Sequence, residues 1–226
     1  MGSLRNNLRV ISQMDWKKKL NLLSCIASDL DAIHSQGLIH RDLHSGNILQ
    51  DTLHSAYVAD LGLLVSNIEQ KKVGVFGILP YIAPEILNGN SYNTTSDIYS
   101  FGIIMWEILY GTTVTYYSDN KLSMMDLQLQ ICYNDLRPPI HKEAPQCYTN
   151  LMKECWDKNS EKRPSAGKLY KIFVEWQNNE IILDLNESKT LSENIENSYA
   201  SIFIRSNFNP YSNTLGLDSN IINLSI

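Results

Sequence analysis

The stretch from Ser96 to Tyr110 constrains the fold more than any other, because it is apolar nearly all the way round a helix. Its sequence is SDIYSFGIIMWEILY, and Gly111 follows at a point where a helix can end. A helix on a protein surface shows one polar face, so a helix without such a face has to be buried. We therefore expect other elements to pack around residues 96–110.

Further helices are indicated by apolar side chains that recur every three or four residues. The strongest such stripe runs through residues 14–36, where Asp15 is placed to cap the start and Gly37 to end the helix. Weaker patterns predict further helices at about 123–133, 148–156 and 165–177.

Two short strands are expected between these helices. Residues 48–50 and 56–59 are apolar runs separated by a polar turn, which predicts a β-hairpin. Residues 60–85 contain several Gly and Pro residues that break regular structure, so this segment is expected to be a loop.

The composition indicates one folded domain followed by a tail. The chain has 226 residues, 43% apolar and 19% charged, which is typical of a soluble globular protein and excludes a wholly disordered one. Residues 178–226 differ, because they hold ten Asn and only two basic residues. We expect a domain at residues 1–177 and an Asn-rich, disordered tail at 178–226.

Charge and cysteine content limit the partners and the compartment. The net charge of −5 argues against a general nucleic-acid binder, and the apolar runs fall short of the ~20 residues that a membrane span needs. The polar first residues lead us to expect no signal peptide. The four cysteines form no Cys-x-x-Cys pair and no zinc-ligand spacing, so we expect a reducing compartment and a cytoplasmic protein.

Three polar side chains carry the chemistry that the sequence predicts. Asp42 and Asn47 lie five residues apart between the first helix and the first strand, and Asp60 follows the second strand directly. Phosphoryl transfer needs such a set: one carboxylate orients the attacking hydroxyl and accepts its proton, while an amide and a second carboxylate hold Mg²⁺. Either aspartate alone would be an ordinary turn residue.

At this point the sequence resembles the protein kinase family. Residues 40–47 (HRDLHSGN) look like its catalytic loop, 60–62 (DLG) like its magnesium motif, and 83–85 (APE) like the end of its activation segment. The resemblance covers residues 1–177 and is strongest to the tyrosine-kinase-like branch. It implies a mainly α fold, the helical C-terminal lobe with a short β hairpin, in which the N-terminal β lobe is absent.

The resemblance assigns catalytic roles to the matching residues. Asp42 would be the catalytic base, and Asn47 and Asp60 would bind Mg²⁺ beside ATP. Leu49 would touch the adenine ring. Arg41 would contact the activation segment, which spans Asp60 to Glu85.

Four further residues match family positions with supporting roles. His40 would join Leu61 in an internal hydrophobic stack. Asp97, at the start of the buried helix, would brace the catalytic loop. Glu85 would form a buried ion pair with Arg163.

The sequence departs from the family at two positions near the site. His44 stands where Ser/Thr kinases usually carry Lys, and we expect it to donate a hydrogen bond to a phosphate or substrate oxygen or else to be a spacer. Ile78 stands where those kinases keep a Thr. Apart from Tyr81, which matches a structural position, Ser66 is the activation segment's hydroxyl residue, so loop phosphorylation is expected to contribute little.

The sequence also lacks a Gly-rich GxGxxG loop and a VAIK-type Lys, so these 226 residues hold half of an ATP site. We therefore expect a protein kinase fragment of impaired activity, acting on protein Ser/Thr rather than Tyr hydroxyls, with a possible partner on the face that the N-terminal lobe would cover. Two alternatives stay open. One is a non-catalytic interaction scaffold, and the other, ranked last, is a small-molecule phosphotransferase.

Overall fold

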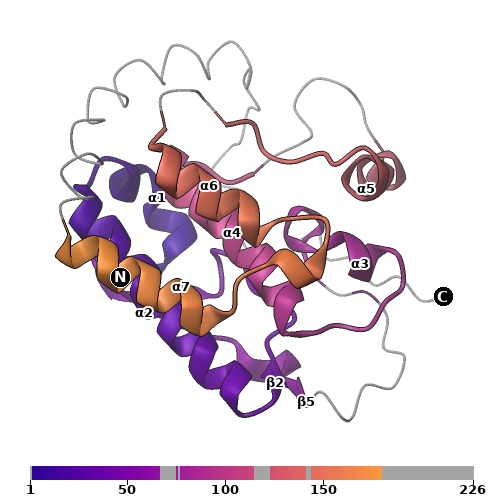
Figure 1. Cartoon of the computed structure of the whole chain (residues 1–226), viewed down its shortest axis with the longest axis horizontal. Coiled ribbons are helices and arrows are strands. Elements are labelled where there is room, and N and C mark those ends of the chain that lie inside the picture. The colour runs from indigo at the N-terminus through magenta and orange to yellow at the C-terminus, as the bar shows by residue number, and fades with distance from the viewer. Residues whose placement is uncertain (1, 67–74, 76, 115–122, 141–143, 180–226) are drawn as a thin grey trace, which may run out of the picture.

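The structure, a computed structural model, describes residues 2–66, 75, 77–114, 123–140 and 144–179. Helices make up most of this part of the chain (Figure 1). They are α1 (Leu4–Ser12), α2 (Trp16–Ser35), α3 (Pro84–Leu87), α4 (Thr94–Tyr110), α5 (Met124–Tyr133), α6 (Gln146–Cys155) and α7 (Ala166–Asn178). The mainly α fold expected from the sequence is confirmed.

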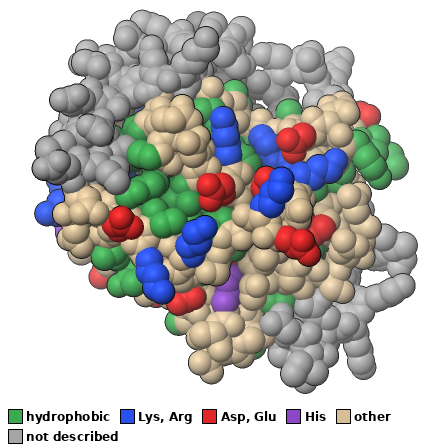
Figure 2. Space-filling view, viewed as in Figure 1, with side chains coloured by type: hydrophobic (Ala, Val, Ile, Leu, Met, Phe, Trp, Pro, Cys, Tyr) green, Lys and Arg blue, Asp and Glu red, His purple; other side chains and the backbone are tan. Residues whose placement is uncertain are grey.

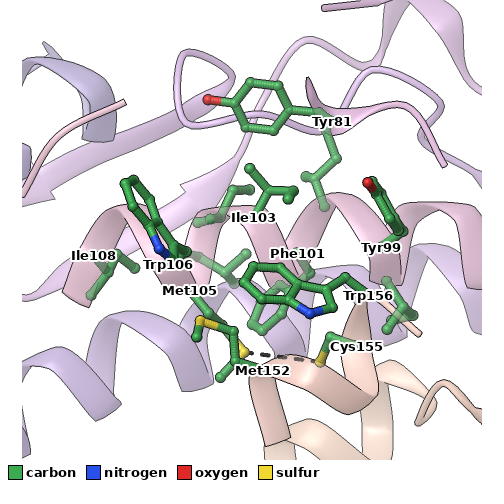
Figure 3. Packing of buried hydrophobic residues seen from close by; sticks show 14 of the residues in the cluster. Tyr81, Tyr99, Phe101, Ile103, Met105, Trp106, Ile108, Met152, Cys155 and Trp156 are labelled. Atoms are coloured by element: carbon green, nitrogen blue, oxygen red, sulfur yellow. Dashed lines mark hydrogen bonds between the residues drawn. The ribbon is translucent and has the colours of Figure 1, made fainter. Parts of the chain in front are cut away.

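Helix α4 is the buried centre that its composition predicts, with side chains buried on every side. Asn93 and Ser96 form a reciprocal cap at its start, and Gly111 takes the left-handed φ of 74° just after its end. In Figure 3 the α4 side chains meet Met152 and Cys155 of helix α6. This packing holds α4 in place next to the polar site.

Helices α2 and α7 lie side by side (Figure 1), and the sequence features that predict both are confirmed. The Asp15 carboxylate accepts the Lys18 N–H at the start of α2, and Gly37 follows its end with a φ of 69°. Gly167 lets the two helices approach closely, because a Cβ there would lie 2.7 Å from Asp31 Oδ1.

The strands form two small antiparallel sheets. In one, β3 (Ile48–Thr52) lies between β1 (Gly2–Ser3) and β4 (Ser55–Val58), which confirms the β3–β4 hairpin. In the other, β2 (Leu38–Ile39) pairs with β5 (Val65–Ser66). The β2–β5 pair brings the residues just before the 40–47 loop next to those just after Asp60.

Helix α1 was not predicted, although its pattern is readable. Leu4, Leu8 and Ile11 recur at helical spacing and are buried, while the other face is polar except for Val10. Predicted helices 123–133, 148–156 and 165–177 are confirmed as α5, α6 and α7. The expected tail, apart from the first residues of 178–226, lies outside the described residues.

The described surface in Figure 2 mixes acidic and basic side chains over α6 and α7 and gathers apolar ones at the edge over α5. The exposed apolar residues of α5 include Met125, Leu129 and Tyr133. Among the described residues, no helix has both the length and the apolar character needed to cross a membrane.

Candidate active site

The 40–47 loop is anchored to the start of α4 by one buried carboxylate. Asp97 Oδ1 accepts the Arg41 N–H and Asp97 Oδ2 accepts the His40 N–H, both at 2.9 Å. The ring Nε2 of His34, from helix α2, also lies 2.9 Å from Asp97 Oδ2. These bonds hold Arg41 at a φ of 70°, a conformation that costs energy in a non-glycine residue. Asp97 therefore fixes the backbone conformation of Arg41, the residue that directly precedes Asp42.

Asp42 and Asn47 face each other across this loop. The Asn47 amide Nδ2 donates to the Asp42 carbonyl at 2.9 Å and to Asp42 Oδ2 at 3.3 Å. On the other side, a Cβ at Gly77 would lie 3.3 Å from Asp42 Oδ1, so the glycine leaves room beside this oxygen. Burial raises the pKa of Asp42, and the negative charge of Asp60 raises it further. The charges of His40 and Arg5 and the hydrogen bond from Asn47 act in the opposite direction. A raised pKa makes the carboxylate a better base.

Asp60 is joined to the same loop through its neighbour. The Ala59 N–H donates to the Asn47 carbonyl at 2.8 Å, which places the end of β4 against the 40–47 loop. Asp60 itself is exposed, and its backbone has the left-handed conformation, with φ 58° and ψ 64°. It precedes a 3₁₀ turn at Leu61–Leu63. Asp42, Asn47 and Asp60 are therefore brought to one place.

One expectation at this turn is wrong. Leu61 was expected inside a hydrophobic stack with His40, but 49% of its surface is exposed. The reason is the left-handed backbone at Asp60, after which the 3₁₀ turn leaves Leu61 outside the described core. His40 is fully buried, and its ring Nε2 donates to the Ala59 carbonyl at 3.0 Å.

The remaining predicted site residues surround this centre. The Arg41 guanidinium lies over the Tyr92 ring, 5.5 Å from its centroid, just beyond the activation segment. Leu49 is half-buried on β3. His44 lies beside the carboxylate, with its Nε2 3.7 Å from Asp42 Oδ2.

The structure brings Glu85 and Arg163 together although they are 78 residues apart in the chain. Arg163 Nη1 and Nη2 donate to Glu85 Oε1 and Oε2 at 2.6 and 2.8 Å, and the Arg163 side chain is fully buried. Nη1 also donates to the Thr95 carbonyl, and Nε donates to the Asp157 carbonyl, both at 2.9 Å. This pair fixes the end of the activation segment to the turn before α7.

Sequence reasoning missed a buried polar cluster formed by Ser45, Tyr81 and Glu107. The Tyr81 hydroxyl donates to Glu107 Oε1 at 2.5 Å and lies 3.3 Å from Ser45 Oγ. The Val114 N–H also donates to Glu107 Oε1, at 3.1 Å. The available signal was Glu107 itself, a charged residue inside an otherwise apolar helix. The cluster ties the 40–47 loop and the activation segment to α4.

Burial raises the pKa of Glu107 to about 7, although hydrogen bonds from Tyr81, Ser45 and Val114 and the charge of Arg5 oppose this. In the unfolded chain this carboxyl has an ordinary pKa, so between about pH 4.5 and 7 the folded state binds more protons. The contribution of Glu107 to stability therefore falls as pH rises through this window.

The Glu107→Gln variant should lose that pH dependence, because its amide keeps the same oxygen without a charge. In urea unfolding at pH 5, 6, 7 and 8, the stability of the variant relative to the parent should rise with pH and level off above about pH 7. A difference that is the same at all four pH values would contradict the assignment.

The chemistry of these groups fits a magnesium ion that is shared with a phosphate ligand. The described residues contain no group of three or more His, Cys, Asp or Glu side chains that could hold a metal alone. Mg²⁺ in phosphate-binding sites is usually held by one or two carboxylates together with phosphate oxygens. Asn47 Nδ2 is engaged by Asp42, which leaves the amide oxygen of Asn47 to join the Asp60 carboxylate.

Comparison with known proteins finds a matching family and similar relatives. The sequence model of the family described as protein tyrosine and serine/threonine kinase matches residues 1–173. The chain is 34% identical over 166 residues to the serine/threonine-protein kinase/receptor R818 of Acanthamoeba polyphaga mimivirus, covering 73% of this chain and 10% of that protein. It is also 34% identical over 201 residues to the dual specificity protein kinase zakA of Dictyostelium discoideum, covering 83% of this chain and 25% of the relative. The chain thus spans a quarter or less of these relatives.

Proposed function

Because the chain belongs to the protein tyrosine and serine/threonine kinase family, we propose that its described lobe supplies the catalytic loop of an ATP-dependent kinase acting on Ser or Thr hydroxyls of proteins. The observation that carries this proposal is the convergence of Asp42, Asn47 and Asp60 on one place. The names of the similar relatives, which include serine/threonine-protein kinases, support Ser/Thr as the acceptor class.

In the proposed reaction, Asp42 orients the substrate hydroxyl and accepts its proton while the oxygen attacks the γ-phosphorus of ATP. The bond between the γ-phosphorus and its bridging oxygen breaks, and ADP leaves. The Asp42 carboxylate is held for this role by the Asn47 amide on one side, and Gly77 leaves space on the other. Burial and the raised pKa of Asp42 favour proton uptake.

Two side chains would hold the metal that this chemistry uses. Asn47, through its amide oxygen, and Asp60, through its carboxylate, would bind Mg²⁺. When bound, the ion neutralises charge on the phosphate oxygens. Leu49 would lie under the adenine ring.

The face around the β3–β4 hairpin supports the proposal of a further partner. Leu49 and Tyr57 are directly opposite each other on β3 and β4, and Tyr57 is 47% exposed. Leu61, 49% exposed, follows on the same strand–turn segment. We assign these apolar residues to contact with a kinase amino-terminal lobe, whose Gly-rich loop and Lys complete the ATP site in this family.

The 226-residue chain alone should therefore bind Mg-ATP weakly, with a Kd above about 1 mM, which is less than ~4 kcal/mol of binding free energy. Isothermal titration with Mg-ATP measures this. Joining the chain to the amino-terminal lobe of a relative, here called the lobe-extended protein, should tighten binding and allow phosphate transfer to a protein substrate. Tight binding by the 226-residue chain alone would contradict the account of a half site.

The alternative function as a non-catalytic scaffold predicts the same fold and the same exposed face. It differs in predicting that the lobe-extended protein transfers no phosphate. Retention of all three reactive side chains favours the kinase. A cytoplasmic location is supported by the four cysteines, none of which forms a disulfide in the described part of the chain.

A further inference from the structure

One nitrogen of the His44 ring lies among hydrogen-bond donors. Its Nδ1 lies 2.9 Å from the Gly46 backbone nitrogen and 3.2 Å from the Asn47 backbone nitrogen, whose N–H also donates to the His44 carbonyl at 2.9 Å. Arg5 Nη2, at 3.5 Å, is a further donor. Because these neighbours are N–H donors, Nδ1 has to offer its lone pair, so the proton of the neutral ring belongs on Nε2.

The other ring nitrogen faces the reactive carboxylate. Nε2 lies 3.7 Å from Asp42 Oδ2, which is just beyond hydrogen-bond distance. With the tautomer fixed by Nδ1, the Nε2–H group points its positive end toward Asp42. Both side chains are mostly buried, at 12% and 22% exposed, so this dipole is only weakly screened by water.

The ring is held in this orientation by its neighbours. A Cβ at Gly46 would lie 2.7 Å from His44 Cε1 and 2.8 Å from Nδ1, so glycine leaves room for the ring in this position. The Tyr81 ring lies 5.8 Å away, centroid to centroid, and is itself fixed by its hydrogen bond to Glu107. A residue that serves only as a spacer would not need neighbours that fit closely around its side chain.

We propose that His44 is a positioning residue with two separate tasks: its Nδ1 accepts the Gly46 N–H group and so holds the backbone that leads to Asn47, and its Nε2–H steadies the Asp42 carboxylate. The effect on catalysis rests on the proposed kinase function, but the tautomer and the loop geometry do not. A Lys side chain at this position could supply a positive charge near Asp42 but no acceptor for the Gly46 N–H group.

Two variants separate the tasks because of where their amide atoms lie. In His44→Asn, Oδ1 is bonded to Cγ, as Nδ1 is in His, so the acceptor is kept and the group facing Asp42 is lost. In His44→Gln, the amide nitrogen reaches the position of Nε2, but Cγ carries no acceptor. His54→Asn, at the exposed turn between β3 and β4, is the matched control.

The first test uses the 226-residue chain and needs no activity. Long-range ¹H–¹⁵N spectra of the His44 ring should show the proton on Nε2 in the parent chain. Amide exchange at Gly46 should be about as slow in His44→Asn and in the His54→Asn control as in the parent, and about tenfold faster or more in His44→Gln. A proton on Nδ1, or equal protection in the Gln variant, would overturn the proposal. The parent spectrum decides even if a variant fails to fold.

The second test measures kinetics in the lobe-extended protein. His44→Gln should raise KM for Mg-ATP about tenfold, because Nδ1 no longer holds the Gly46 N–H group beside Asn47, while His44→Asn should mainly lower kcat by about the same factor. Identical effects on kcat and KM in the two variants would overturn the division of tasks. If the lobe-extended parent itself transfers no phosphate, the kinase function fails while the tautomer result stands by itself.

Discussion

Replacing Arg163 by Ala should lower the free energy of unfolding by about 3–5 kcal/mol. The Arg163 guanidinium is fully buried and makes two short bonds to the Glu85 carboxylate, with further bonds to two backbone carbonyls. Without it, the Glu85 charge is left in a site with little access to water, and the carbonyls of Asp157 and Thr95 lose their donors. Urea unfolding of the 226-residue chain at pH 7 measures the loss.

Two further variants show whether the loss comes from the unpaired charge. Replacing both partners, as Arg163→Met with Glu85→Leu, should cost less than Arg163→Ala alone, because no buried charge remains. Lys18→Ala removes an exposed ion pair with Asp15 and should cost less than about 1 kcal/mol. A loss below about 1 kcal/mol for Arg163→Ala would mean that water reaches Glu85 and that the pair does not fix the segment.

The parts of the fold that were predictable from sequence are those with local signals. Helix α4 is identified by its uniformly apolar composition, and α2 by its stripe, its Asp15 cap and Gly37. Helix α1 was not predicted because it is only nine residues long and its three buried positions are separated by mostly polar residues, so its apolar stripe is weak. Strands β2 and β5 have two residues each and exist through pairing with each other, which no local pattern records.

The residues of the candidate site also fall into those that a sequence pattern predicts and those that it does not. The motif residues Asp42, Asn47 and Asp60 were predictable because their order and spacing match a family, and the structure places them together. The Tyr81–Glu107 bond joins residues 26 apart, and sequence alone does not state which distant polar groups meet in a core. Leu61 was misplaced because its position depends on the left-handed backbone of Asp60, a property of one residue's φ and ψ.

Replacing Asp42 by Asn in the lobe-extended protein should lower kcat by about 10²–10⁴-fold, because the base that takes the hydroxyl proton is removed. Nucleotide binding should stay nearly unchanged, since the metal ligands in the proposal are Asn47 and Asp60. Steady-state phosphate transfer and Mg-ATP titration measure the two effects. Asp60→Asn is the contrasting variant, because loss of a metal ligand should weaken Mg-ATP binding as well.

The same Asp42→Asn change can be tested for stability in the 226-residue chain, where no activity is needed. Burial raises the pKa of Asp42 in the folded state. Above the ordinary pKa of this group, the negative charge is therefore less favourable in the folded state than in the unfolded state. At pH 7 the neutral Asn should therefore leave the urea midpoint unchanged or raise it. Loss of turnover with an intact or raised midpoint assigns Asp42 to the chemistry, since a structural role would lower both. Retained turnover would remove Asp42 from the mechanism and require another group to take the hydroxyl proton.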